Sequence, residues 1–520
     1  MLNLPPVTRV AVTNSLPWVR LPSVRLPVVG VRGFAGCALQ AGCALQTLCL
    51  SMALMLLTSP TASAADAAPV QRPNIIYIMA DDLGYADLGC YGQKVIATPN
   101  LDRMARQGLR FTDHYAGHTV CRPSRLVLWT GKHVGHTGLI GNAARSLTGK
   151  ETTVAKLLQS AGYSTGGVGK WALGNVDRPE DIHNDGHPLN NGFDDWFGYM
   201  NQSNAHNYYP TFLWHNREQI PLPGNVIMDD PQARGRVSET RVTYSHDKLI
   251  AHAFDFIRRH QDKPFLLHMH LTIPHANNEG GRVTGDGMEV PDHGPYEKED
   301  WPTPEKGFAS MVTRMDGDIG RLLTLLKNLQ LEERTLVLFT SDNGPHHEGG
   351  HDEEFFDSNG ELQGSKRSMH EGGIRVPLIA RWPGTIRAGT VSDHPSAFWD
   401  FLPTACELAG VPVPHDTDGI SYASTLLGKT PQQKHDYLFW ATSEGDTSVG
   451  IRAGRWKLVN HPQKGSKRIK NSPHPIVNPD GWRLHDLSVD PGEQDDLSES
   501  NPSIRSKILA QVRADGLLLD

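Results

Sequence analysis

Short apolar runs alternate with amphipathic stretches along most of the chain. Five apolar runs predict buried strands, and polar or charged residues follow each of them. These runs span 74–79, 164–168, 264–271, 336–340 and 376–381. Apolar residues at helical spacing predict helices over 101–107, 153–159, 243–259, 308–329 and 401–409. Strands that alternate with helices are typical of an α/β protein, so we predict a large, mainly parallel central sheet flanked by helices.

The pattern changes in the last part of the chain. Four short strand-like runs, separated by turns, span 437–442, 448–452, 456–459 and 482–487, and a closing helix is predicted over 503–512. This predicts a smaller C-terminal α+β domain with a short antiparallel sheet. We therefore divide the chain into 1–64, a main domain over 65–430 and a small domain over 431–520.

Residues 1–64 have the pattern of a secretory signal peptide. Four arginines and no acidic residue precede an apolar run from about 33 to 57, which ends before Ala62-Ser63-Ala64. A membrane anchor is the alternative for a run of this kind. The better interpretation is cleavage near Ala65, which makes the protein exported, periplasmic or secreted, with no stable membrane anchor.

Composition narrows the class of partner. The 520 residues are 38% hydrophobic and carry a net charge of −7, which is enough for a large core and argues against disorder. A mildly negative chain also argues against nucleic acid or an anionic membrane as the main partner. Beyond residue 64 the cysteines are Cys90, Cys121 and Cys406. These are too few for a disulfide framework, and we expect Cys90 and Cys406 to be small buried thiols, although a bond between them stays open.

Polar residues stand where several predicted strands end. Because ligands of open α/β sheets bind outside the carboxyl ends of the strands, we expect these residues to meet along one edge. They are Asp81, Asp82, Lys170, His275, Asp342 and Asn343. The three carboxylates and the amide oxygen form a hard-oxygen donor set suited to Ca²⁺ or Mg²⁺. Taken separately, D-D-x-G and D-N-G are also ordinary turn sequences.

The stretch V-C-R-P-S-R-L-V-L-W-T-G-K over 120–132 predicts a helix. Pro123 suits the first turn, and Gly131 is placed to end the helix. Cys121 would lie one residue before the helix, on the same face as Arg125 and among free backbone N–H groups that favour an anion. A lone cysteine at such a place is more often a small buried residue.

The C-R-P-S-R run followed by T-G resembles the signature of the sulfatase family, part of the alkaline phosphatase superfamily. The resemblance covers about 73–430 and extends loosely to the end. The local sequence motifs are similar to those of bacterial exported carbohydrate sulfatases. Further matching motifs are T-P-N-L-D-R-M at 98–104, G-K-W at 169–171, P-H at 274–275, G-S-K-R at 364–367 and E-G-G-I-R-V-P at 371–377. Two positions depart from the family pattern: Lys132 replaces an arginine, and Ala172 replaces a histidine.

The resemblance implies specific roles. Cys121 would be converted by a formylglycine-generating enzyme to formylglycine (3-oxoalanine), whose hydrate is the nucleophile. One calcium ion would be bound by Asp81, Asp82, Asp342 and Asn343, with an oxygen of the modified Cys121 as a further ligand. Sulfate oxygens would be held by Lys170 and Lys366, the hydrate by Arg125, and the leaving alcohol would be protonated by His275.

The missing histidine at Ala172 leaves regeneration of the aldehyde without its usual residue. We hypothesise that His206 takes its place, with His346 as the second candidate, because both lie in polar segments near predicted strand ends. Gln202, His206, Asn277 and His346 are the candidate substrate contacts beside the two lysines. Their surroundings are rich in aromatic and amide side chains, which suit a sugar, although an ordinary aromatic-stabilised loop explains them equally well.

The sequence thus predicts a formylglycine- and calcium-dependent sulfatase that hydrolyses a sulfate ester of a carbohydrate, with galactose and N-acetylgalactosamine sulfates as the first candidates. A phosphonate monoester or phosphodiester hydrolase of the same superfamily is the nearest alternative. A non-catalytic sulfoglycan-binding protein, with Cys121 unmodified, is the alternative from another class.

Overall fold

The computed structural model describes residues 72–142, 147–174, 179–462 and 477–518, all within one compact unit, Val70–Asp520. The predicted signal peptide over 1–64 lies outside the described residues. Among the helices of the described residues, none combines the length and apolar character that crossing a membrane requires.

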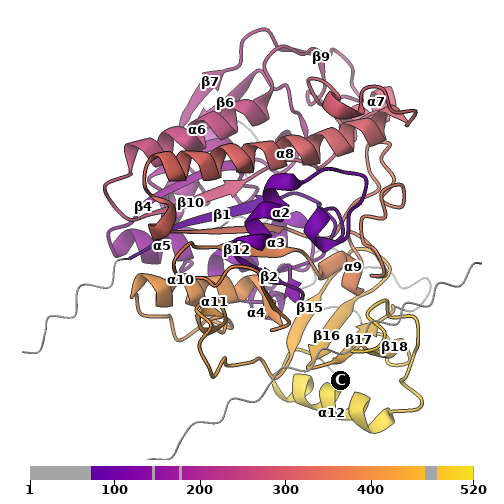
Figure 1. The fold of residues 1–520 in the computed structure, drawn as a ribbon. Coiled ribbons are helices and arrows are strands. Elements are labelled where there is room, and N and C mark those ends of the chain that lie inside the picture. Colours follow the sequence, from indigo (N-terminus) through magenta and orange to yellow (C-terminus); the bar gives the residue numbers. More distant parts are fainter. Residues whose placement is uncertain (1–71, 143–146, 175–178, 463–476, 519–520) are drawn as a thin grey trace, which may run out of the picture. The chain divides into compact units, whose positions relative to one another are not determined.

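A large sheet forms the centre (Figure 1). It has ten strands, in the order β13-β2-β12-β11-β1-β10-β4-β5-β6-β7. The strands are β1 (Asn74–Ala80), β2 (Leu109–Phe111), β4 (Ser164–Lys170), β5 (Asp195–Tyr199), β6 (Phe212–His215), β7 (Glu218–Pro221), β10 (Phe265–His270), β11 (Thr335–Ser341), β12 (Leu378–Arg381) and β13 (Thr390–Ser392). The five middle strands, from β11 to β5, are parallel, whereas β12, β6 and β7 pair antiparallel with their neighbours. The α/β prediction is confirmed, with a mixed rather than parallel arrangement at the sheet edges.

One predicted strand runs in the other direction. β12 is antiparallel to β11, so its carboxyl end, with Arg381, lies at the opposite edge from the ends of β1, β4, β10 and β11. None of the six residues expected to meet at the strand ends follows β12, so that expectation does not depend on this strand.

Helices cover both faces of the sheet. Side chains of β1 point alternately to the two faces, so that each face contributes to its own apolar core. Ile76 and Ile78 pack with α2 (Pro99–Arg106), α6 (Ser245–Arg259) and α8 (Thr303–Asn328). Ile75, Tyr77 and Met79 share the other core with α3 (Cys121–Thr130), α5 (Val154–Ser160) and α10 (Phe401–Ala409) (Figure 1). All five predicted helices are present within a few residues of their predicted bounds.

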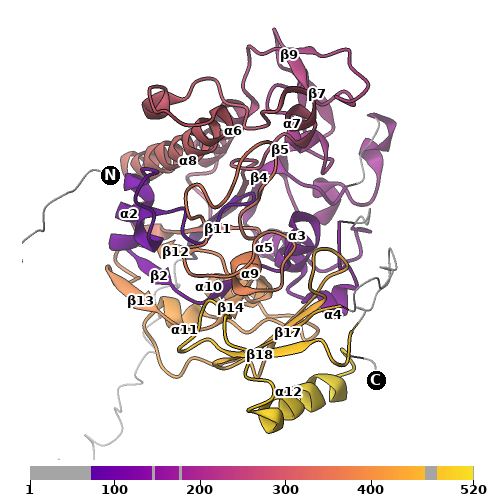
Figure 2. The ribbon, with the colours of Figure 1, turned by 90° about the vertical axis from the view of Figure 1, so that its right-hand side faces the viewer.

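The predicted C-terminal sheet is also present. It consists of β15 (Leu438–Ala441), β16 (Val449–Ala453), β17 (Trp456–Asn460) and β18 (Trp482–Asp486), all antiparallel, with α12 (Pro502–Ala514) beside it (Figure 2). Trp440 of β15 lies in the same apolar core as Tyr115, and its indole N–H donates to the carbonyl of Ala116 at 2.9 Å. The small sheet thus shares the apolar core on this face of the large sheet.

The remaining elements are short. They are β3 (His114–Tyr115), α4 (Val134–Thr137), β8 (Val226–Ile227), β9 (Ser238–Thr240), α7 (Asn278–Thr284), α9 (Glu371–Ile374), β14 (Ser396–Ala397) and α11 (Ala423–Leu426). Cys90, Cys121 and Cys406 are free thiols. The prediction of buried thiols is confirmed for Cys406, whereas Cys90 is only half-buried.

Candidate active site

The carboxyl ends of the parallel strands bring the predicted polar residues together. Asp81 and Asp82 follow β1, and backbone bonds fix them, because the Asp81 N–H donates to Ile273 at 3.2 Å and the Asp342 N–H donates to Ala80 at 3.1 Å. Lys170 is the last residue of β4, the strand that pairs with β10. All six predicted strand-end residues are buried: Asp81, Asp82, Lys170, His275, Asp342 and Asn343.

Helix α3 places Cys121 in this cluster. The helix begins at Cys121 itself, so the prediction that the cysteine lies one residue before the helix is wrong by one position. Gly131 ends the helix in the left-handed conformation (φ 65°), as predicted. The thiol donates to Asp81 Oδ1 at 3.2 Å and lies 3.7 Å from Asp82 Oδ1. Burial, with Asp342 and Asp81 nearby, raises the pKa of the Cys121 thiol well above its ordinary value, so the unmodified side chain is a neutral thiol and a weak nucleophile.

Arg125 lies four residues after Cys121 and joins three of the strand ends. Its Nη2 contacts Asp342 Oδ2 at 2.7 Å and Asp81 Oδ2 at 3.1 Å, and its Nη1 donates to the carbonyl of Lys170 at 2.8 Å. A fully buried guanidinium is stable only with such partners. Arg125 therefore fixes the acidic residues relative to α3.

Two buried lysines each form an ion pair with a different aspartate of the cluster. Lys170 Nζ is 2.7 Å from Asp81 Oδ2, and Lys366 Nζ is 2.7 Å from Asp82 Oδ2. Lys366 also contacts Glu348 at 2.8 Å, an acidic residue that the sequence analysis missed. Glu348 lies in the loop after β11, where polar residues without periodicity gave no signal. The two lysines make this strand-end cluster suited to an anionic group.

His275 is held with one defined ring nitrogen toward the cluster. Its Nδ1 lies 2.6 Å from the carbonyl of Ala276 and must donate to it, because a carbonyl only accepts. Its Nε2 then faces Lys366 Nζ and Asp82 Oδ2, each at 3.3 Å. Burial, together with Lys366 and Lys170, lowers the pKa of His275 to about 3.

Both candidate replacements for the missing histidine lie beside His275. The ring of His206 stacks on it with centroids 4.6 Å apart, and the ring of His346 lies 6.0 Å away. His346 has both nitrogens on backbone groups, at 3.1 Å from Pro274 O and 3.0 Å from Glu348 N. His206 Nδ1 is bound to Glu279 at 3.1 Å, which leaves Nε2 on the side away from that carboxylate. Ala172 is buried and has φ 68°.

The two remaining substrate candidates differ in their surroundings. Asn277 caps α7, accepting from the Gly280 N–H at 3.0 Å and donating to the Arg236 carbonyl at 2.9 Å, so both ends of its amide are held by backbone groups. Gln202 lies in the turn after β5, and its Oε1 has no hydrogen-bond partner among the described residues. The geometry therefore leaves Gln202 available for a ligand and gives Asn277 a structural role.

The acidic cluster fits a divalent cation. Asn343 Oδ1 is buried and accepts no hydrogen bond from the described residues. Burial and the adjacent Asp81 raise the pKa of Asp342 to about 7, although Arg125 opposes this. An unsatisfied oxygen beside three crowded carboxylates is the donor set of a hard cation such as Ca²⁺. Ligand atoms of Asp81, Asp82, Cys121 and His275 all lie within 4.8 Å of one another.

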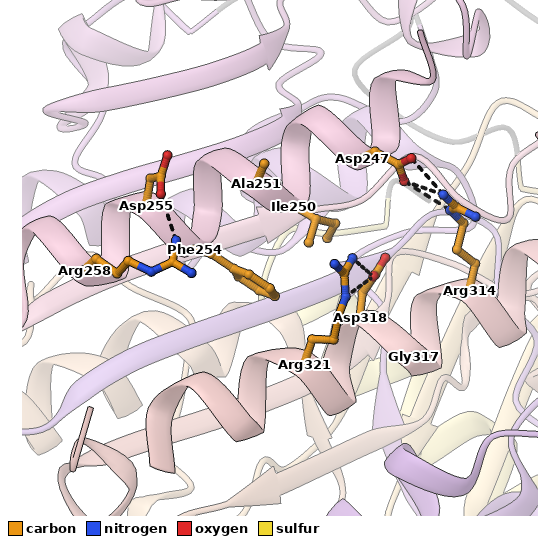
Figure 3. A pocket seen from close by; sticks show the side chains of 10 residues that line it. All are labelled: Asp247, Ile250, Ala251, Phe254, Asp255, Arg258, Arg314, Gly317, Asp318 and Arg321. Atoms are coloured by element: carbon orange, nitrogen blue, oxygen red, sulfur yellow. Dashed lines mark hydrogen bonds and ion pairs between the residues drawn. The ribbon is translucent and has the colours of Figure 1, made fainter. Parts of the chain in front are cut away.

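A second concave surface lies elsewhere. A groove of about 630 Å³ is lined only by residues of α6 and α8 (Figure 3). Its charges are paired with each other: Asp247 with Arg314, Asp318 with Arg321 and Asp255 with Arg258. These pairs neutralise the groove, whereas the strand-end cluster combines a cation site with two lysines and a histidine.

An α/β fold with this cluster at its strand ends is typical of hydrolases of anionic esters. Residues 73–411 match the family model "Sulfatase", and residues 364–514 match "N-sulphoglucosamine sulphohydrolase, C-terminal". Arylsulfatase A of Homo sapiens is 34% identical over 470 residues, covering 84% of this chain and 85% of that protein. Steryl-sulfatase of Rattus norvegicus is 30% identical over 553 residues, covering 89% of this chain and 91% of that protein.

Solved structures agree with this. The crystal structure of Ps i-CgsB in complex with k-i-k-neocarrahexaose superposes with a TM-score of 0.66 at 27% identity, covering 85% of this chain and 92% of that chain. The chain belongs to the sulfatase family. It is a hydrolase of sulfuric esters.

Proposed function

We propose that this sulfatase is exported, uses a formylglycine made from Cys121 and a calcium ion, and hydrolyses a sulfate ester of a carbohydrate. The observation that carries the proposal is the position of Cys121 at the first turn of α3, with its Sγ 3.2 Å from Asp81 Oδ1 inside the strand-end cluster. Export is supported by the signal-like pattern of residues 1–64.

The maturation partner would be a formylglycine-generating enzyme. Cys121 is fully buried in the folded chain, so such an enzyme would have to act on it before the fold closes. The aldehyde hydrate would supply an oxygen nucleophile that the neutral, buried thiol does not offer.

Asp81, Asp82, Asp342 and Asn343 would hold the calcium ion, which would supply positive charge to the sulfate group. Support comes from the buried, unsatisfied Oδ1 of Asn343 and from the crowding of the three carboxylates. Arg125 would keep Asp81 and Asp342 in place through its contacts at 3.1 and 2.7 Å.

The sulfate would lie between the two lysines. Lys170 and Lys366 would exchange their contacts with Asp81 and Asp82 for sulfate oxygens and so stabilise negative charge as it shifts toward the leaving oxygen. Nε2 of His275 is the ring atom that faces this space. Because Nδ1 holds the proton of the neutral ring, Nε2 would take up a proton from solvent when the anionic substrate binds and would then deliver it to the leaving alcohol.

His206 would assist regeneration of the aldehyde in place of the histidine that Ala172 replaces. It stacks on His275, and Glu279 orients it as a carboxylate orients a catalytic histidine. His346 is less suited, because backbone groups engage both of its ring nitrogens.

A sulfated glycan is the proposed substrate, and sulfates of galactose and N-acetylgalactosamine are the first candidates. Support comes from Ps i-CgsB, whose structure contains k-i-k-neocarrahexaose. The direct test is sulfate release by the wild-type protein and by Cys121→Ala from a panel of sulfated sugars and from an aryl sulfate. Wild-type turnover that Cys121→Ala abolishes supports the proposal. Equal turnover by both proteins, or faster hydrolysis of a phosphodiester of the same phenol than of its sulfate, contradicts it.

A further inference from the structure

A small pocket adjoins the strand end that carries Lys170. It measures about 120 Å³ and is built around Tyr199, Asn204, Phe212, Trp214 and Arg236. Tyr199 is the register partner of Lys170 in the parallel pair of β4 and β5. Asn204 belongs to the 3-10 helix η4 (Asn204–His206), which also carries His206. The pocket therefore begins one strand away from Lys170 and two residues away from the histidine that stacks on His275.

The pocket contains a cation that its neighbours only partly engage. Arg236 contacts Asn204 Oδ1 at 3.3 Å and Glu279 Oε1 at 3.5 Å, and its side chain is 26% exposed. Charge-assisted hydrogen bonds of this kind are usually about 2.7–2.9 Å long. Glu279 has a closer partner in His206 at 3.1 Å and a third neighbour in Arg282 at 3.8 Å. One carboxylate is thus shared between two arginines and a histidine, so Arg236 keeps capacity for a further anion.

The rest of the pocket suits a sugar ring. Phe212 and Trp214 of β6 lie edge to face with centroids 5.6 Å apart, and Asn204 adds an amide. Aromatic faces cover the apolar side of a pyranose, while amides and a guanidinium bond to its hydroxyl and acidic groups.

We propose that this pocket binds the sugar residue next to the one that carries the scissile sulfate, and that Arg236 recognises a carboxylate or a second sulfate on that residue. This inference rests on the proposed function and extends it. The preferred substrate is then an acidic oligosaccharide rather than a sulfated monosaccharide or a sulfated disaccharide with a neutral neighbour.

The test compares kcat/KM for three substrates: an aryl sulfate, a sulfated disaccharide with a neutral neighbouring sugar, and the same disaccharide with a carboxylate or sulfate on that neighbour. Arg236→Ala should lower kcat/KM for the acidic disaccharide about ten-fold or more, since a hydrogen bond to a charged group is lost. Its kcat/KM for the aryl sulfate should stay within about two-fold of wild type.

Two further variants separate recognition from structure. Arg282→Ala removes a cation from the same Glu279 without lining the pocket and should leave the preference among substrates unchanged. Thr211→Trp places a ring into the pocket from an exposed position and should raise KM for both disaccharides but not for the aryl sulfate.

An equal loss on all three substrates in Arg236→Ala would assign that residue a structural role and overturn the inference, as would an unchanged rate on the acidic disaccharide. The proposed function fails in a different way: the wild-type protein would then release sulfate from none of the three substrates.

Discussion

Replacing Glu371 by glutamine removes one charge from a buried ion-pair network and hardly changes the size of the side chain. Glu371 begins α9, and its Oε1 lies 2.7 Å from Lys457 Nζ of β17, both side chains being fully buried. Its Oε2 accepts from the Tyr115 hydroxyl at 2.5 Å and lies 3.4 Å from Arg375. The network therefore joins α9 and β3 to the C-terminal sheet.

The cost of Glu371→Gln can be estimated in two ways. Removing one partner of a buried ion pair costs about 3–5 kcal/mol. Burial would raise the pKa of Glu371, but Lys457, Arg375 and Arg452 together lower it from 4.5 to about 2, and a difference of that size corresponds to about 3 kcal/mol. We expect a loss of about 3 kcal/mol at pH 7, the lower end of the range, because Glu493 also lies 3.6 Å from Lys457.

The pH dependence follows from the sign of the shift. The folded-state pKa of Glu371 is lower than its unfolded value, so its stabilisation is complete above about pH 4.5 and is lost as the pH falls toward 2. The difference in unfolding free energy between wild type and Glu371→Gln should therefore be constant near neutral pH and shrink on acidification. Urea unfolding followed by tryptophan fluorescence measures it, with Glu361→Gln, an exposed position, as the matched control. A Glu371→Gln variant as stable as the control at pH 7, or a difference that does not shrink in acid, would show that the Glu371 carboxylate does not stabilise the fold through this ion-pair network.

Three further predictions concern the strand-end site. Lys366→Ala should lower kcat for sulfate ester hydrolysis about a hundred-fold or more, because a preorganised cation is removed; a kcat near that of wild type would contradict the role. His206→Ala should keep the initial burst of released phenol but slow the steady state, which stopped-flow absorbance resolves, and an unchanged steady state would exclude it from regeneration. Chelation with EGTA should lower the melting temperature, and excess Ca²⁺ should restore it. Binding of Ca²⁺ to the folded state at a hundred-fold excess over Kd would stabilise that state by about 2.7 kcal/mol. A melting temperature unaffected by both treatments would argue against the calcium site.

The sequence was informative where long apolar runs coincide with buried strands. β1, β10 and β11 are fully buried, so their apolar runs were unambiguous, and the polar residues after them were placed together correctly. β5 was missed because the run D-W-F-G-Y is short and contains Gly198, which lowers strand propensity. The direction of β12 could not be predicted either, because antiparallel pairing at a sheet edge depends on connections that a pattern of apolar residues does not encode.

Residues recruited from loops and short helices were the hardest to predict. Glu348 contacts Lys366 from a polar loop without periodicity, and Glu279 contacts His206 from the first turn of the short helix α7, which was not predicted. Asn277 was predicted as a substrate contact from its polar surroundings, although the same surroundings suit the helix cap that it forms. Composition alone does not separate these two uses of an asparagine.

The proposed mechanism depends on the conversion of Cys121 to formylglycine. The most direct measurement is the mass of the tryptic peptide Phe111 to Arg125 from active protein purified from its native host, which stays whole because Pro123 blocks cleavage after Arg122. We expect a peptide that is lighter by the difference between a thiol and an aldehyde side chain and that reacts with a hydrazide probe. A protein preparation that hydrolyses sulfate esters although every copy of this peptide carries an unmodified cysteine would contradict the formylglycine mechanism.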